Sequence, residues 1–198
     1  MKAAQIAATA LGVLAGLSGL EHGWFEIQQG NIPPASLVFA SMGSPCVAAT
    51  AWHACEPALT LLPNLLAAGL LALLLALLVL VWSLFFIQSK HGGSLLIALS
   101  IVMLLVGGGF FPPLIGLAGG AAGMQINKPR TGKQDGLARF AAGLWPWPLA
   151  ILIFVLLAQI PLGYFFNDFL MSIMGYVLLL IVVFLPLSVY CAYAHDAA

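Results

Sequence analysis

The chain has 198 residues, of which 63% are hydrophobic and only 6% are charged, with six Lys and Arg against six Asp and Glu. A water-soluble domain carries about 25% charged residues, so this composition excludes an ordinary soluble protein and indicates an integral membrane protein. Because the net charge is zero, no basic field is available for nucleic acid, and nucleic acid is excluded as a partner.

Membrane-spanning helices are the elements that the sequence predicts most directly. A helix needs about 20 apolar residues to cross a hydrocarbon core of about 30 Å. Four windows near that length lack Lys, Arg, Asp and Glu, and a fifth is interrupted by Gly and Pro. We therefore expect an all-α, polytopic membrane protein with four full crossings and one broken segment, in a single membrane domain. The expected helices cover residues 3–28, 57–88, 94–124 (broken), 144–166 and 169–194 of the domain 1–198, with an outer loop at 29–56.

The first helix follows Lys2 directly. A cleaved signal peptide over residues 1–20 is the alternative, but its apolar run is longer than the typical length of about 7–15 residues. Its only Ala-x-Ala pattern, at residues 8–10, lies inside that run, so we expect the helix to be retained. Glycines spaced four apart on this helix allow another helix to approach closely. These pairs are Gly12 with Gly16 and Gly19 with Gly23.

Three ionisable residues, Glu21, His22 and Glu26, end the first helix. Such groups at membrane depth are costly and are functional candidates. Positions four apart share a helix face, so His22 and Glu26 are placed to touch, whereas Glu21 points elsewhere. One hypothesis is an interfacial anchor, in which His22 and Glu26 are hydrogen bonded where the helix leaves the membrane. The other hypothesis is a ligand, proton or cation site.

The outer loop contains Cys46 and Cys55. An outside location is oxidising, so we expect these cysteines to form a disulfide. A metal site that adds His53 is the alternative, but its spacing matches no standard zinc pattern, and no metal site is expected. Cys191 lies in the last apolar run and is interpreted as a small apolar residue.

Glu56 and Pro57 are expected to open the second helix, because Pro suits the first helical position and a carboxylate there faces the positive end of the helix dipole. A sharper hypothesis is that Glu56 joins Glu21 and Glu26 in a cation-attracting rim at the outer mouth.

The broken segment contains the run Gly107-Gly108-Gly109-Phe110-Phe111-Pro112-Pro113. It is either a re-entrant hairpin with this run at its tip, or a single helix kinked by Pro112. The hairpin is favoured, because it leaves the basic residues before and after it on one side, as the positive-inside rule requires. Those residues are Lys90 before the segment and Lys128, Arg130, Lys133 and Arg139 after it.

The same rule places the N-terminus, with Lys2, in the cytoplasm. The basic stretch is followed by a short amphipathic piece around Leu137, Phe140 and Leu144. Trp145 and Trp147 then mark a membrane interface, where indole rings settle.

Several short motifs together resemble a group of uncharacterised bacterial multipass membrane proteins. The resemblance covers most of the chain and implies a protein of the bacterial inner membrane, without implying an activity. The motifs are Glu21-His22-Gly23, Glu56-Pro57-Ala58 followed by Pro63-Asn64, the Gly107 to Pro113 run, and Tyr193-Ala194-His195-Asp196.

No nucleophile, phosphate-binding, dinucleotide-binding or metalloprotease motif occurs, so we expect neither an enzyme nor a cofactor. The leading expectation is a non-enzymatic subunit of a membrane complex, or a protein that packs with itself, with lipid as its other partner. The alternative is a small transporter or channel that uses residues 107–113 and the outer acidic cluster, since broken helices commonly bind ions.

Overall fold

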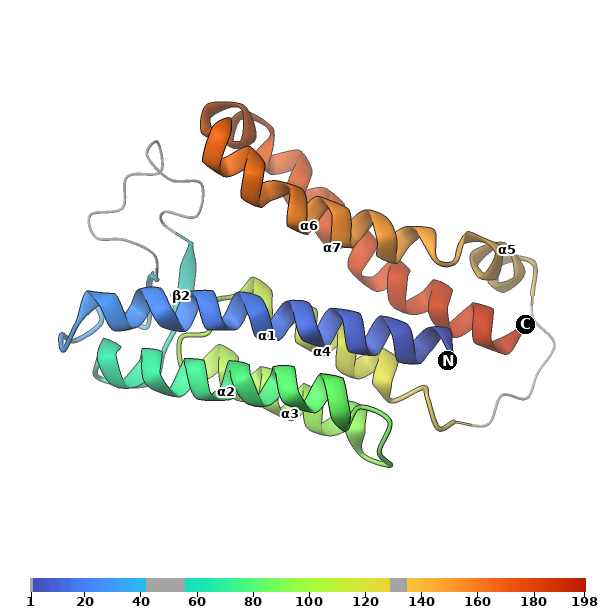
Figure 1. The fold of residues 1–198 in the computed structure, drawn as a ribbon, viewed down its shortest axis with the longest axis horizontal. Coiled ribbons are helices and arrows are strands. Elements are labelled where there is room, and N and C mark those ends of the chain that lie inside the picture. Colours follow the sequence, from blue (N-terminus) through green and yellow to red (C-terminus); the bar gives the residue numbers. More distant parts are fainter. Residues whose placement is uncertain (1, 42–55, 129–134) are drawn as a thin grey trace.

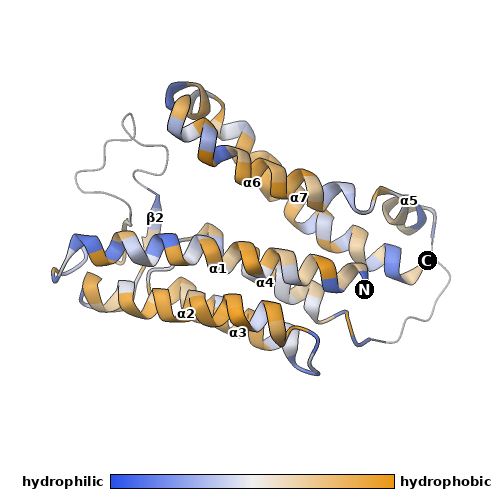
Figure 2. Ribbon diagram, in the orientation of Figure 1, coloured by the Kyte–Doolittle hydropathy of each residue, from blue (hydrophilic) through white to orange (hydrophobic). Residues whose placement is uncertain are grey.

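A computed structural model of the chain describes residues 2–41, 56–128 and 135–198. Over these residues the protein consists of seven helices and one pair of short strands (Figure 1). Four of the described helices are long and apolar enough to cross a membrane, which suggests a membrane-embedded protein. Their middle parts are strongly hydrophobic, and polar residues gather near their ends (Figure 2). The four are α1 (Ala3–Gln29), α2 (Leu65–Phe85), α6 (Trp147–Phe165) and α7 (Asn167–Ala197).

The second helix begins later than the sequence predicts. Pro57–Leu59 forms β2, which pairs antiparallel with β1 (Val38–Ala40), so the prediction that Glu56 and Pro57 open the helix is wrong. The α2 helix starts after Asn64, whose side chain accepts a hydrogen bond of 3.0 Å from the Ala67 amide. This N-cap satisfies one of the amides that a helix start leaves free, which Glu56 is too far along the chain to do.

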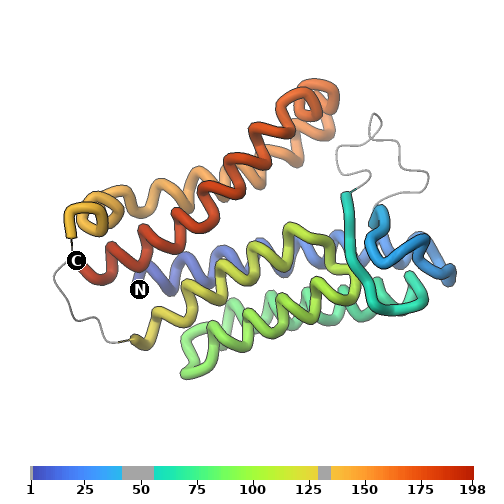
Figure 3. The backbone as a smooth tube through the Cα atoms, turned by 180° about the vertical axis from the view of Figure 1, so that it is seen from behind, coloured from blue at the N-terminus to red at the C-terminus, as the bar shows by residue number. Residues whose placement is uncertain are grey.

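The broken segment forms two helices, α3 (Gly92–Leu105) and α4 (Phe111–Gly123), which pack antiparallel (Figure 3). A methyl group on Gly93 would meet the backbone of Gly120, so the two helices pass in close contact. The segment therefore returns to the end at which it began and is not one kinked helix. Pro112 and Pro113 lie in the first turn of α4, where a missing amide hydrogen costs nothing, so they start a helix instead of bending one.

Helix α1 packs against α2 on one side and α4 on the other, and this four-helix body also includes α3. The α6 and α7 helices form a separate pair, which lies beside the body at the end that holds both termini and diverges from it toward the other end (Figures 1 and 3). The two parts are tied by Asp196, whose carboxylate accepts hydrogen bonds from the amides of Ala3, at 2.6 Å, and Ala4, at 2.9 Å. The short helix α5 (Gly136–Leu144) packs against α7 at this same end.

The charges of the described residues are divided between the two ends of the molecule. Lys2 donates a hydrogen bond of 2.6 Å to the carbonyl of Ile126, and Asn127 donates one of 3.1 Å to that of Gln88, so the segments around Lys90 and Lys128 adjoin the N-terminus. Glu21, Glu26 and Glu56 belong to the opposite end, which we call the acidic end.

Candidate functional site

The acidic end of α1 presents His22 and Glu26 on one face, toward the segment that joins α3 to α4. Both side chains are buried, since His22 is 2% exposed and Glu26 is 0% exposed. The hydrogen bond expected between them is not formed: neither Glu26 carboxylate oxygen has a hydrogen-bond partner among the described residues. A buried side chain without a partner is not an interfacial anchor, because an anchor's charged group is solvated by water.

The glycines of the broken segment make room for these two side chains. Gly107 has φ of +103° and Gly109 has φ of +76°, conformations that side-chain-bearing residues rarely adopt. A methyl group on Gly107 would overlap the Glu26 carboxylate, and one on Gly109 would lie 2.6 Å from His22 Nε2. The 107–109 backbone therefore covers the Glu26 carboxylate at closer range than any other residue would allow.

The residues that follow β2 hold this cover in place. The Leu61 amide donates a hydrogen bond of 2.9 Å to the carbonyl of Leu105, and Thr60 forms a β-bridge with Val106. The β1–β2 pairing also brings Glu56 close to His22 of α1. The sequence had instead predicted Glu56 at the start of the second helix.

His22 is held between two partners at the acidic end. Its Nδ1 lies 2.9 Å from Ser41 Oγ and its Nε2 lies 3.0 Å from Glu56 Oε2. Because the Ser41 hydroxyl donates to the Glu56 carbonyl, at 3.0 Å, Nδ1 is the donor to Ser41 Oγ. The ring of His22 is thus held by one partner at each of its nitrogens, with Nε2 directed at the Glu56 carboxylate.

A crevice of about 470 Å³ separates the acidic end of α1 and α4 from α6 and α7. Glu21, His22 and Glu56 line it, together with Gln159 and a majority of apolar side chains. Glu26 is not part of its wall and lies one helical turn farther along α1. Of the three carboxylates predicted to form a rim, Glu21 and Glu56 line the crevice, whereas Glu26 lies against Gly107 of the broken segment.

The crevice reaches far along the helix axis. Its lining on α1 runs from His22 to Leu14. At about 1.5 Å per residue, Leu14 lies about 16 Å from Ala3, roughly half of a hydrocarbon core of about 30 Å. The crevice therefore extends from the acidic end to about the middle of the helical body.

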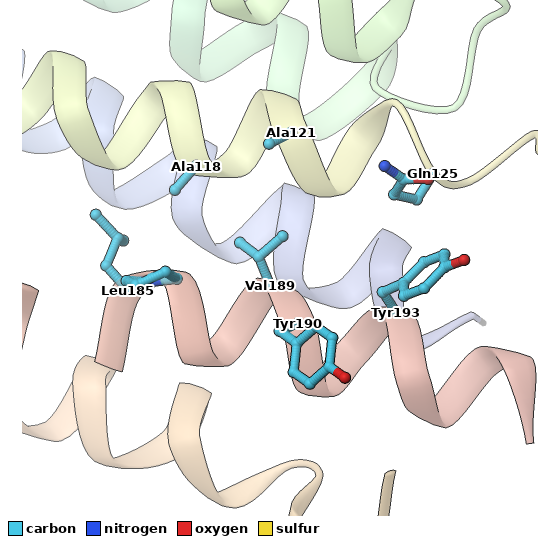
Figure 4. Close-up of a pocket in the computed structure, with 8 residues that line it drawn as sticks. Ala118, Ala121, Gln125, Leu185, Val189, Tyr190 and Tyr193 are labelled. Atoms are coloured by element: carbon cyan, nitrogen blue, oxygen red, sulfur yellow. The ribbon is translucent and has the colours of Figure 1, made fainter. Parts of the chain in front are cut away.

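A second cavity, of about 480 Å³, lies between α4 and α7 near the opposite end (Figure 4). The small side chains of Ala118 and Ala121 face Leu185 and Val189 across it, and none of its lining residues carries a charge. It offers no group that would orient a ligand other than the amide of Gln125 and two tyrosine hydroxyls.

Two site residues were missed from the sequence. Ser41 lies in a stretch rich in Pro and Ser, in which nothing marks it as the partner of His22. Gln159 could have been identified from the sequence, because it is a lone amide side chain inside an apolar run. Polar residues of this kind usually face the interior of a helical bundle. Cys46, His53 and Cys55 lie outside the described residues, so the predicted disulfide and its metal alternative stay predictions. Among the described residues no group of three metal-ligating side chains is found.

Comparison of the chain with known protein families, with curated proteins and with solved structures finds no significant match.

Proposed function

We propose that the protein is a small, non-enzymatic cation transporter of the bacterial inner membrane, with Glu26 as its cation-binding carboxylate. The supporting observation is that both Glu26 oxygens are buried without a hydrogen-bond partner among the described residues. A charged carboxylate in this situation costs several kcal/mol unless a proton or a cation compensates it, so a structural role alone does not account for its presence. Ionisable groups of this kind within membrane helices mark ion pathways.

The neighbouring groups supply an entry route for the cation. In the proposal, a cation reaches the His22–Glu56 pair from the crevice and passes to Glu26 when the 107–109 backbone moves aside. His22 contacts both the crevice and Gly109, so it links the open space to the covered carboxylate. The transported cation is a proton or a small metal ion, since a single carboxylate accepts either.

The proposed orientation has the end that holds Lys2, Lys90 and Lys128 in the cytoplasm and the acidic end outside. In this orientation the α3–α4 hairpin is re-entrant from the cytoplasm, and its tip reaches the level of His22. The 14 residues of α3 and the 13 of α4 span about 20 Å each, less than a full crossing of about 30 Å. The positive-inside rule supports this arrangement, because the Lys90 and Lys128 segments share one end.

Cysteine labelling of intact cells tests the orientation. In a background without the three native cysteines, Lys90→Cys and Lys128→Cys should both resist a membrane-impermeant thiol reagent. Ser36→Cys, on the exposed part of the acidic end, is the matched control and should react. Labelling at Lys128 but not at Lys90 would contradict the re-entrant hairpin.

Ion flux in liposomes tests the transport proposal. Purified protein is reconstituted, and an imposed gradient drives proton entry reported by a pH-sensitive dye, or sodium entry reported by a sodium-sensitive dye. We expect flux of one of these ions, and its loss in Glu26→Gln, which keeps the size of the side chain and removes its charge. Asp168→Asn, an exposed carboxylate outside the site, should transport normally. Absence of both fluxes in the wild-type protein, or unchanged flux in Glu26→Gln, would overturn the proposal.

A second candidate function is that of a subunit in a larger membrane complex or homo-oligomer. It is favoured by the outward faces of α6 and α7, where many large apolar side chains are exposed and offer a surface for another helix as well as for lipid. Purification from native membranes distinguishes the two candidates, because a stoichiometric large partner supports the subunit. The most exposed of these side chains, apart from Tyr164 in the crevice wall, are Trp147, Phe154, Phe165 and Tyr176.

A further inference from the structure

The Glu26 carboxylate faces a backbone C–H bond. A methyl carbon built on Gly107 would be almost equally far from the two carboxylate oxygens and farther, at 2.6 Å, from the carboxyl carbon. A position nearer to both oxygens than to the carbon that joins them lies in front of the carboxylate, on its open side. The Cα–H bond of Gly107 that the methyl group would replace therefore points between the two oxygens.

A metal ion held by both oxygens would need this same position. Hard cations such as Ca²⁺ lie about 2.3–2.6 Å from their oxygen ligands. At that distance from both Glu26 oxygens, the ion would lie where the methyl carbon was built, only about 1.5 Å from the Gly107 Cα atom. The closed site therefore has no volume for a metal ion between the oxygens, whereas a proton on one oxygen needs almost none.

The polar groups around Glu26 are directed at other partners. The Gly108 amide donates a hydrogen bond of 2.9 Å to the Met103 carbonyl, and Glu56 contacts His22. An ionised carboxylate is stabilised by amide donors or by an opposite charge, and among the described residues neither Glu26 oxygen has a hydrogen-bond partner. A buried carboxyl group in such surroundings takes its neutral form, because the acid has no net charge to desolvate.

We infer that the ion bound by Glu26 is a proton, and that the Gly107 backbone excludes metal ions from the carboxylate while it covers it. The proton bonds to one carboxylate oxygen and gives the neutral acid, so one negative charge is cancelled and no other group changes. The inference rests on the proposed function in taking Glu26 as the cation-binding carboxylate, and it names the ion that the closed site accepts.

Infrared spectroscopy of the purified protein tests the inference. In dodecyl maltoside, a detergent without a carbonyl group, a neutral carboxylic acid has a C=O stretching band separate from the bands of carboxylates and amides. Exposed carboxyl groups are ionised at neutral pH. We therefore expect this band in the wild-type protein, its loss in Glu26→Gln, and its retention in Asp168→Asn, which alters an exposed carboxylate. Absence of the band from the wild type, or its survival in Glu26→Gln, would overturn the inference.

Added sodium distinguishes a proton site from one that protons and metal ions share. The spectrum is recorded in sodium chloride and in N-methylglucamine chloride at the same concentration and pH. We expect the wild-type band to be the same in both, because sodium has no position between the oxygens. A weaker band in sodium chloride alone would show that sodium displaces the proton, and would overturn the exclusion of metal ions.

Glu26→Asp tests the role of the Gly107 contact. Its side chain is one methylene shorter, so the carboxyl group withdraws from Gly107 by about 1.5 Å and leaves space in front of its oxygens. We expect sodium chloride to weaken the carboxylic acid band of this variant while the wild-type band stays unchanged. A band that is indifferent to sodium in Glu26→Asp as well would overturn the role assigned to Gly107.

The outcome is separable from that of the ion-flux experiment. The infrared band is measured without a membrane gradient and does not require Glu26 to release its proton. Sodium flux that depends on Glu26 would keep the proposed function and overturn this inference. A protonated Glu26 in a protein that shows no flux of either ion would keep the proton site and overturn the transport proposal.

Discussion

The four-helix body and the α6–α7 pair are similarly apolar in sequence, yet their helices are packed to different extents. Half of the most apolar window of α1 is buried, at 50%, against 17% for α7. The difference follows the glycines. A methyl group on Gly16 or Gly23 of α1 would collide with the α2 backbone, whereas one on Gly175 of α7 would meet nothing within 4 Å. In lipid, where apolar side chains gain little by leaving their surroundings, small residues decide which helices pack closely.

This contrast explains where the candidate site lies. Glu26 and its glycine cover belong wholly to the closely packed body, which holds the carboxylate away from solvent. The crevice lies at the boundary between the two parts, and its apolar wall belongs to the loosely packed pair. Four substitutions break or sharpen this comparison, and they are taken from the largest expected effect to the smallest.

Gly23→Val should have the largest effect. The new side chain begins 2.8 Å from the Leu73 amide nitrogen, so α1 and α2 must separate along their length. Overpacking of this kind costs about 3 kcal/mol, and we expect a matching fall in thermal stability, measured by size-exclusion chromatography of heated protein in detergent. A variant as stable as the wild type would mean that glycine does not determine the packing of the body.

Gly107→Ala should destabilise the protein by about 2 kcal/mol and abolish ion flux, because the methyl group adds strain at a positive φ and overlaps the Glu26 carboxylate. Gly30→Ala is the matched control, since Gly30 has φ of +88° but nothing within 4 Å of its added methyl group. It should show the backbone cost alone and keep its flux. Equal behaviour of the two variants would show that the close approach to Glu26 is irrelevant.

Asp196→Ala tests the tie between the two parts. It removes the acceptor of two α1 amides and a negative charge at a helix N-terminus, which together should cost about 1–2 kcal/mol. Thermal unfolding in detergent measures the loss. Asp135→Ala removes the N-cap of α5 instead and should cost about 1 kcal/mol without loosening α1 from α7.

Gly175→Ala should have the smallest effect and the opposite sign. A methyl group has room there, so the higher helix propensity of Ala should raise the stability by about 0.5 kcal/mol. The same unfolding measurement detects it. A clear loss of stability would instead indicate that this face of α7 is occupied by another chain, and would favour the subunit function.

Local patterns in the sequence were sufficient to locate the long helices. Unbroken apolar windows indicated α1, α6 and α7, and the basic residues on both sides of the broken segment favoured a hairpin, whose antiparallel packing the structure shows. The start of α2 was not predictable in the same way. Glu56 and Pro57 have the composition of a helix start, but a strand pairing with Val38–Ala40, which no local pattern announces, overrides it.

The site was predictable only to the level of a helix face. Spacing placed His22 and Glu26 on one face of α1, and the structure has both of them there. The spacing did not indicate that His22 would contact Ser41 and Glu56, or that Gly107 would approach Glu26. These contacts join residues far apart in the chain, and their partners follow from tertiary packing alone.

The hydrogen bonds from the amides of Ala3 and Ala4 to Asp196 have a consequence for biosynthesis. The first turn of α1 leaves the ribosome with amides that hydrocarbon cannot satisfy, and the carboxylate that accepts from them lies 193 residues beyond Ala3. Until that residue is synthesised, water or lipid headgroups must accept the hydrogen bonds of those amides. This requirement keeps the start of α1 at the membrane surface. Docking of α7 thus completes the hydrogen bonding of a helix end that was synthesised long before α7, so α1 and α7 depend on each other when the bundle assembles.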